Sequence, residues 1–119
     1  MRLLFISERY PPHLTGGYEV ACAANGRQAL DHLNQSQDLP QSIILDLMMP
    51  TMNGWEFSRE LSMSDKYKEI PILALTAFSR LARGMRCNEI LKKPIELDQL
   101  LERVKYYASL DSAESYNEH

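Results

Sequence analysis

Three side chains of different chemistry follow short apolar segments of this sequence. Asp46 and Thr76 each end such a segment, and Lys93 comes directly after a third. A carboxylate that attacks a phosphoryl group needs its own charge and that of the transferring oxygens neutralised, by a divalent metal ion and by an ammonium group. A hydroxyl can then hydrogen-bond the transferred oxygens. The three side chains therefore suit phosphoryl transfer to a carboxylate, provided that the fold brings them together.

Each of these residues also has an ordinary structural interpretation. An aspartate at the end of a strand often caps a helix or forms a turn, a threonine favours strands, and a lysine is usually solvated. The occurrence of all three at the ends of successive predicted strands favours the functional interpretation of the set.

Alternating strand and helix signals predict an α/β fold. Apolar or alternating runs predict five strands, at residues 3–6, 18–23, 42–46, 72–76 and 88–92. Amphipathic periodicity predicts helices at residues 26–34 and 55–61 and after Pro94. Strands that alternate with helices form a parallel sheet covered on both faces, and such sheets bind ligands at the carboxyl ends of their strands.

Length and composition narrow the class of protein. The 119 residues are 45% hydrophobic and 24% charged, as in an ordinary soluble domain, and we expect one domain at residues 1–110 followed by a polar tail at residues 111–119. The net charge of −3 argues against nucleic-acid binding. No apolar run has membrane-spanning length and no signal peptide is recognised, so a cytoplasmic location is expected. Cys22 and Cys87 have no metal-type spacing and are expected to be buried, reduced thiols.

Residues 18–107 resemble the receiver domains of bacterial response regulators. The most specific part is residues 42–54, an apolar strand that ends in Asp46 and is followed by Pro and Asn-Gly. The resemblance implies a flavodoxin-like (CheY-like) three-layer fold with five parallel strands in the order 2-1-3-4-5. It also implies that Asp46 is the phospho-acceptor, that Thr76 contacts the phosphoryl group, that Lys93 offsets its charge, and that the peptide bond after Lys93 is cis.

The resemblance further implies a Mg²⁺ site, but the expected acidic residues are incomplete. Receivers carry an acidic pair directly after the first strand, where this sequence has Ser7 and Glu8. The expected ligands are Glu8, Asp46 and the backbone carbonyl of Met48. Because Ser7 cannot supply the missing charge, we expect weaker Mg²⁺ binding and slower phosphorylation than in a standard receiver.

The resemblance fails between the first two strands, where receivers have a helix. Residues 8–17 contain two prolines and two glycines, so a Pro/Gly loop is expected instead, either extended and tight or with the first strand paired differently. The missing helix would leave one sheet face uncovered, which favours self-association, a partner's helix or instability. Residues 1–19 resemble instead the start of retaining two-domain glycosyltransferases. A chimera and a loop replacement within a receiver are both open as its origin.

A further departure lies before the fifth strand. Arg80, Arg83 and Arg86 recur at i, i+3 and i+6 in a segment too short for the full fourth helix of a receiver. A solvated face and a docking site for a partner are both open for these arginines. Ile90 stands where receivers often have an aromatic residue.

The sequence thus predicts a single-domain response regulator without an output domain, which is not an enzyme in the ordinary sense. It would accept a phosphoryl group on Asp46 from a sensor histidine kinase or a histidine phosphotransfer protein. Two alternatives remain. One is a degenerate pseudo-receiver or chimera that acts only as a protein-interaction module. In either case, the chain could also self-associate through the uncovered sheet face. The other is a remnant that binds a nucleotide sugar through residues 15–17.

Overall fold

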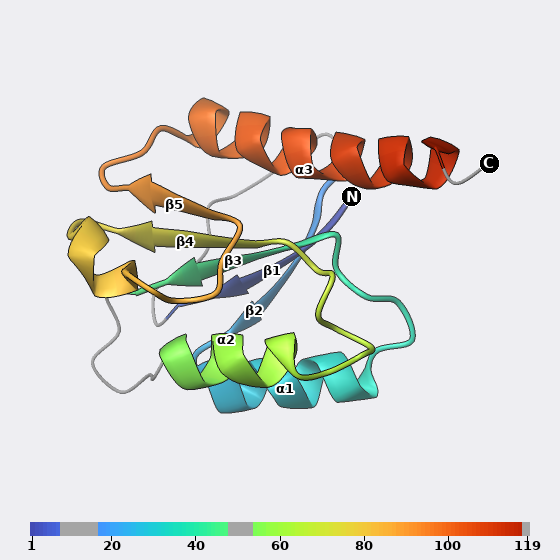
Figure 1. Cartoon of the computed structure of the whole chain (residues 1–119), viewed down its shortest axis with the longest axis horizontal. Coiled ribbons are helices and arrows are strands. Elements are labelled where there is room, and N and C mark those ends of the chain that lie inside the picture. The colour runs from blue at the N-terminus through green and yellow to red at the C-terminus, as the bar shows by residue number, and fades with distance from the viewer. Residues whose placement is uncertain (8–16, 48–53, 118–119) are drawn as a thin grey trace.

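Five parallel strands form one sheet in the order β2-β1-β3-β4-β5 (Figure 1). The computed structural model describes residues 1–7, 17–47 and 54–117. Its strands are β1 (Arg2–Ile6), β2 (Glu19–Ala23), β3 (Ser42–Asp46), β4 (Ile72–Thr76) and β5 (Glu89–Lys92). Its helices are α1 (Gly26–Gln35), α2 (Gly54–Ser62), the 3₁₀ helix η1 (Ser79–Ala82) and α3 (Leu97–Asn117). The strand order and the elements confirm the predicted flavodoxin-like fold.

The central strands are continuously apolar because helices cover both faces of the sheet. All residues of β3 and β4 are buried. Helices α1 and α2 lie on one face and α3 lies on the other (Figure 1). The core on the α1 and α2 side includes Leu4, Ile6, Ile43, Leu45, Leu33 and Phe57. The core on the α3 side includes Leu3, Phe5, Ile44, Leu73, Leu100 and Val104. The alternation of Leu3 to Ile6 between the two cores is the period-2 pattern of a strand buried on both faces.

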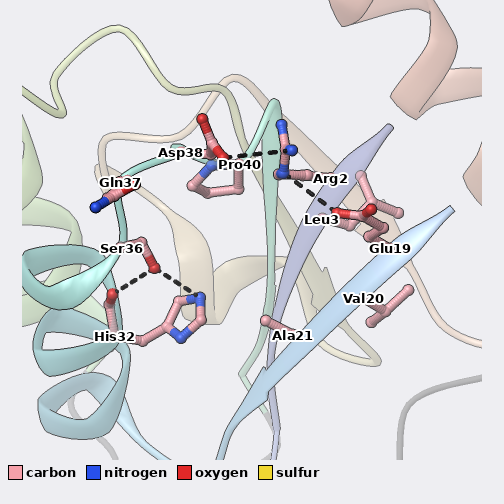
Figure 2. A pocket seen from close by; sticks show the side chains of 10 residues that line it. All are labelled: Arg2, Leu3, Glu19, Val20, Ala21, His32, Ser36, Gln37, Asp38 and Pro40. Atoms are coloured by element: carbon pink, nitrogen blue, oxygen red, sulfur yellow. Dashed lines mark hydrogen bonds and ion pairs between the residues drawn. The ribbon is translucent and has the colours of Figure 1, made fainter.

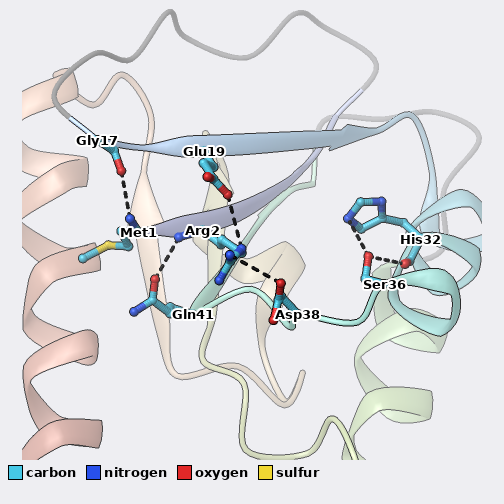
Figure 3. A network of polar contacts seen from close by, with 8 residues as sticks. All are labelled: Met1, Arg2, Gly17, Glu19, His32, Ser36, Asp38 and Gln41. Carbon is cyan, nitrogen blue, oxygen red and sulfur yellow. Dashed lines mark hydrogen bonds and ion pairs between the residues drawn. The ribbon is translucent and has the colours of Figure 1, made fainter.

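Strand β1 lies in parallel register between β2 and β3, so the alternative in which it pairs differently is wrong. Polar contacts hold its amino end in place (Figure 3). The terminal ammonium of Met1 donates to the Gly17 carbonyl at 2.8 Å, and the Glu19 amide donates to the Met1 carbonyl at 2.8 Å. Arg2 forms ion pairs with Glu19 at 3.2 Å and with Asp38 at 3.4 Å. Apart from Gly17, the predicted Pro/Gly loop lies outside the described residues.

The apolar sheet face beside α3 is not exposed at β1, contrary to the prediction. Leu3 and Phe5 are only 2% and 7% exposed, and Val20 of β2 is half-buried. Met1 and Tyr18 are partly buried and pack against the same part of the core as α3. The surface from which self-association was predicted is therefore largely covered.

Helix α3 continues to Asn117, so most of the segment expected as a polar tail is helical, and the domain boundary at residue 110 stays a prediction. One smaller prediction needs correction. Cys22 is exposed rather than buried, because it lies on the edge strand β2. Cys87 is half-buried, and burial raises the pKa of its thiol. Within the described part of the chain, none of the helices combines the length and apolarity that a membrane crossing requires.

A polar cluster ties the edge strand β5 to α3. The Nε of Arg103 donates to Glu89 Oε2 at 2.8 Å, and the guanidinium also donates to the other carboxylate oxygen. The Tyr107 hydroxyl donates to Glu89 Oε1 at 2.9 Å, and the guanidinium lies 4.5 Å from the ring centroid of Tyr106. The hydrogen bond from Arg103 lowers the pKa of Glu89, whereas partial burial raises the pKa of Tyr107.

We expect the contribution of Glu89 to stability to depend on pH. Because its folded-state pKa lies below the ordinary value of 4.5, the stabilisation is fully present above that pH and is lost as the pH falls through the lowered value. In urea titrations, Glu89→Gln should lower the unfolding midpoint at pH 7, and the difference from the native protein should shrink below pH 4.5. Glu102→Gln, at an exposed position of α3, is the control. A pH-independent difference would contradict an electrostatic origin.

Candidate functional site

The carboxyl ends of β3, β4 and β5 bring the three predicted site residues to one edge of the sheet. Asp46 is the last residue of β3 and is in register with Leu75 of β4, so Thr76 is the next residue along. Thr76 in turn is in register with Lys92, and the Lys93 amide donates to the Thr76 carbonyl at 2.8 Å. The spatial grouping expected of Asp46, Thr76 and Lys93 is therefore present.

The Asp46 carboxylate is buried and both of its oxygens accept hydrogen bonds. Its side chain is 7% exposed. Oδ1 accepts from the Lys93 ammonium at 2.8 Å, and Oδ2 accepts from the Ser7 hydroxyl at 3.1 Å. A buried carboxylate is tolerated only with such partners, since its desolvation is costly. The Lys93 side chain, 25% exposed, supplies the compensating charge while retaining contact with solvent.

The contact between Ser7 and Asp46 is the part of the site that the sequence interpretation missed. Ser7 is buried, and its amide donates to the Ala23 carbonyl at 2.9 Å, which extends the pairing of β1 with β2 by one residue. Ile6 is in register with Leu45, so the next residues, Ser7 and Asp46, lie opposite one another. The predicted strand order puts β1 next to β3, but the register of the two strands is also needed to place Ser7 opposite Asp46. Ser7 brings a hydrogen bond to Asp46 and no charge.

The Thr76 hydroxyl is buried and bonded to the backbone two residues later. It donates to the Phe78 carbonyl at 3.0 Å and accepts from the Phe78 amide at 3.0 Å. This local turn fixes the direction in which the chain leaves β4 towards η1. The peptide bond between Lys93 and Pro94 is cis, as the resemblance implied.

Comparison with known families agrees with this geometry. Residues 13–105 match the response regulator receiver domain family. The chain belongs to this family. It is 32% identical over 97 residues to the polar-differentiation response regulator DivK of Brucella anthropi, a match that covers 76% of each chain. It is 35% identical over 94 residues to the response regulator MprA of Mycolicibacterium vanbaalenii, covering 75% of this chain and 39% of that protein.

Solved receiver structures share the fold. The chemotaxis response regulator CheY4 of Vibrio cholerae superposes with a TM-score of 0.71 at 27% identity, covering 89% of this chain and 97% of that one. The receiver domain of the sensor histidine kinase PA1611 from Pseudomonas aeruginosa superposes with a TM-score of 0.74 at 20% identity, covering 91% and 97%. That structure has a magnesium ion coordinated in its active-site cleft. The present chain is thus a receiver domain of two-component signalling, whose family interacts with histidine kinases or phosphotransfer proteins.

The family match includes part of the amino-terminal segment that was predicted to differ from receivers. The family match begins at residue 13, before the start at residue 18 that the sequence interpretation gave. Residues 2–6 form the strand β1 at the place that the receiver sheet requires. The resemblance of residues 1–19 to glycosyltransferases stays a prediction.

One of the three predicted Mg²⁺ ligands, Asp46, belongs to the described residues. Glu8 and Met48 lie outside the described residues. Asp46 provides a carboxylate oxygen, the donor type that Mg²⁺ prefers, at the edge of the sheet where a receiver binds its metal. Among the described residues, no group of three or more His, Cys, Asp or Glu side chains lies close enough to hold a metal ion. Since Ser7 donates to Asp46 Oδ2, a metal ion at that oxygen would have to share it with the hydroxyl.

A separate cavity of about 330 Å³ lies at the amino-terminal ends of β1 and β2, away from Asp46 (Figure 2). Arg2, Glu19 and Asp38 line it, and their charges compensate one another through ion pairs. His32 and Ser36 complete one wall and hydrogen-bond within α1 and at its end. These contacts hold the strands in register, and we assign the cavity no part in the chemistry of Asp46.

We expect the Asp46–Lys93 pair to be strongly coupled in stability. Lys93→Ala leaves the carboxylate buried without its counter-charge and should destabilise the receiver by about 2 kcal/mol at pH 7. Asp46→Asn should cost little, since Lys93 keeps contact with solvent, and in the double variant most of the loss should be recovered. Urea unfolding of the four proteins measures the coupling free energy. Additive effects of the two substitutions would contradict a direct interaction.

Proposed function

We propose that this receiver accepts a phosphoryl group on Asp46 from the phosphohistidine of a sensor kinase or phosphotransfer protein. The observation that carries the proposal is the 2.8 Å contact between the Lys93 ammonium and the Asp46 carboxylate at the carboxyl edge of the sheet. The pair combines a potential nucleophile with a cation that can follow the negative charge as it moves onto the transferred group.

In the proposed reaction, an oxygen of Asp46 attacks the phosphorus atom of the donor. The new O–P bond forms as the P–N bond to the donor histidine breaks, and the electron pair returns to the imidazole. Lys93 then hydrogen-bonds the phosphoryl oxygens. We propose Glu8, Asp46 and the Met48 backbone carbonyl as the groups that hold Mg²⁺, which supplies further neutralisation of the phosphoryl charge when bound.

Thr76 is proposed to respond to the new group. To hydrogen-bond a phosphoryl oxygen, its hydroxyl must give up the contacts with the Phe78 backbone. The chain that leads into η1 would then lose the turn that directs it, and the surface beyond β4 would change shape. Ile90 is an exposed aliphatic residue, so this response does not depend on an aromatic side chain at that position.

The proposal predicts Mg²⁺-dependent phosphorylation at one residue. After incubation with acetyl phosphate and Mg²⁺, intact mass spectrometry should detect the gain of one phosphoryl group. Asp46→Asn should abolish the gain, and Lys93→Ala should slow it by about a hundredfold, because it removes a cation aimed at the developing charge. Circular dichroism of each variant controls for folding. Undiminished phosphorylation of Asp46→Asn would overturn the assignment of the acceptor.

The second candidate is a pseudo-receiver that keeps the fold and acts only by protein contact. The contact of the Ser7 hydroxyl with Asp46 Oδ2 favours it, because a neutral group lies where the family has an acidic residue. In this case Asp46 serves the fold and accepts no phosphoryl group.

Substitution of Ser7 distinguishes the two candidates. In a working receiver, Ser7→Asp adds a carboxylate next to Asp46 and should lower the Mg²⁺ concentration for half-maximal phosphorylation on the order of tenfold. Ser7→Ala, which removes the hydroxyl without adding charge, is the matched control. If the native protein and both variants stay unphosphorylated while folded, the pseudo-receiver is the better description.

Two finer inferences follow from family membership. We infer a signalling role rather than a metabolic one, and a cytoplasmic location, as expected for a partner of histidine kinases. A chimeric origin of residues 1–19 is kept as a hypothesis, and titration calorimetry with a nucleoside diphosphate sugar tests its functional consequence. Self-association through the sheet face beside α3 stays a hypothesis, which the burial of Leu3 and Phe5 in that face does not favour.

A further inference from the structure

The segment that joins β4 to β5 carries an unusual concentration of positive charge. Residues 77–88 contain Arg80, Arg83 and Arg86 and no acidic residue, although the whole chain has a net charge of −3. All three arginines are exposed. Because η1 ends at Ala82, Arg83 and Arg86 do not share a helical face with Arg80. Their side chains extend from an irregular segment next to α2.

A groove of about 380 Å³ lies between this segment and α2. It is lined by Trp55, Glu56, Ser58, Arg59, Gly84 and Arg86, and we call it the Trp55 groove. Trp55 is 47% exposed, which is high for the largest apolar side chain of the protein. Gly84 has φ +80°, and a Cβ added there would lie 3.2 Å from the Trp55 ring. The absence of a side chain at Gly84 therefore lets the indole approach the backbone.

The groove is held in shape by buried contacts beneath it. The Ser58 hydroxyl donates to the Arg86 carbonyl, which joins α2 to the irregular segment. Ala82 and Met85 are buried in the core, on either side of the exposed Arg83 and Gly84. A preformed groove loses little conformational entropy when it binds a ligand.

The charge of the groove is predominantly positive. Arg59 and Arg86 line it, and Arg83 adjoins Gly84. Within the described residues, no ion pair to a carboxylate involves any of these three guanidinium groups. Among the described residues that line the groove, Glu56 is the acidic one, and it lies at the border, because it also lines the cleft with Arg27 and Leu30 of α1.

We propose that the Trp55 groove binds an acidic peptide segment of a partner protein. An apolar side chain of the peptide would pack against the indole, and its carboxylates would pair with Arg59, Arg83 and Arg86. Trp and Arg are the residues that most often dominate binding energy at protein interfaces. Arginine is also the cation best suited to bidentate pairing with carboxylates. A long polyanion fits less well, because the negative net charge of the chain opposes it outside this patch.

The single tryptophan makes the proposal directly measurable, since Trp55 is the only one in the chain. The probe is an eight-residue peptide with a central Leu-Phe pair flanked by six glutamates, and its control has lysines in place of the glutamates. We expect a saturable change in tryptophan emission with the acidic peptide and none with the basic one. The combined substitution Arg59→Ala with Arg86→Ala should weaken binding at least tenfold, and added salt should weaken it as well.

Two control variants distinguish peptide binding in the Trp55 groove from general charge attraction and from phosphorylation of Asp46. Arg27→Ala removes an exposed arginine of α1 outside the groove and should leave binding unchanged. Asp46→Asn should also bind the peptide, so that the result does not depend on the proposed phosphoryl transfer. No change in emission up to millimolar peptide, or equal weakening by Arg27→Ala, would overturn the proposal. An emission change that follows protein concentration without peptide would also overturn it, by assigning the groove to a second copy of the chain.

Discussion

The burial of the Asp46 carboxylate is the constraint that decides which side chains surround it at the carboxyl edge of the sheet. A charge with this little exposure requires a counter-charge and hydrogen-bond donors at its own oxygens, and it obtains them from Lys93 at 2.8 Å and Ser7 at 3.1 Å. These residues come from three different strand ends. The parallel sheet brings all three carboxyl ends to one edge, and its strand order puts β3 next to β1, with β4 and then β5 on its other side.

At the same edge of the sheet, this receiver departs from the pattern of its family at Ser7. Ser7 occupies a place next to Asp46 where an acidic residue is expected, and it satisfies the hydrogen-bonding requirement of the carboxylate without adding negative charge. A neutral donor reduces the repulsion around a buried carboxylate and at the same time reduces the attraction for a divalent cation. The Asp46 carboxylate is therefore well compensated by its two hydrogen-bond donors, and weaker Mg²⁺ binding than in a standard receiver stays a prediction.

The segment after β4 links this site to the outer surface. Thr76 holds the backbone of Phe78, and from there the chain passes through η1 to Gly84, against which the Trp55 ring lies. Shortening of the expected helix to one 3₁₀ turn leaves Arg83 and Arg86 on an irregular segment beside α2. The Trp55 groove combines an exposed aromatic ring with arginines that form no ion pair within the described part of the chain, a composition typical of binding surfaces rather than of a solvated face.

The sequence by itself determined the element order, the parallel sheet and the positions of Asp46, Thr76 and Lys93 at strand ends, while their roles in phosphoryl transfer stay a proposal. These features rest on local signals: apolar strands, amphipathic helices, and the positions of Asp46, Thr76 and Lys93 at strand ends. The tertiary structure decided that Ser7 faces Asp46, that Leu3 and Phe5 are covered, and that Trp55 meets Gly84. Each of these joins residues far apart in the chain through strand register or side-chain packing. Local periodicity cannot specify such contacts, because they depend on the relative positions of whole elements.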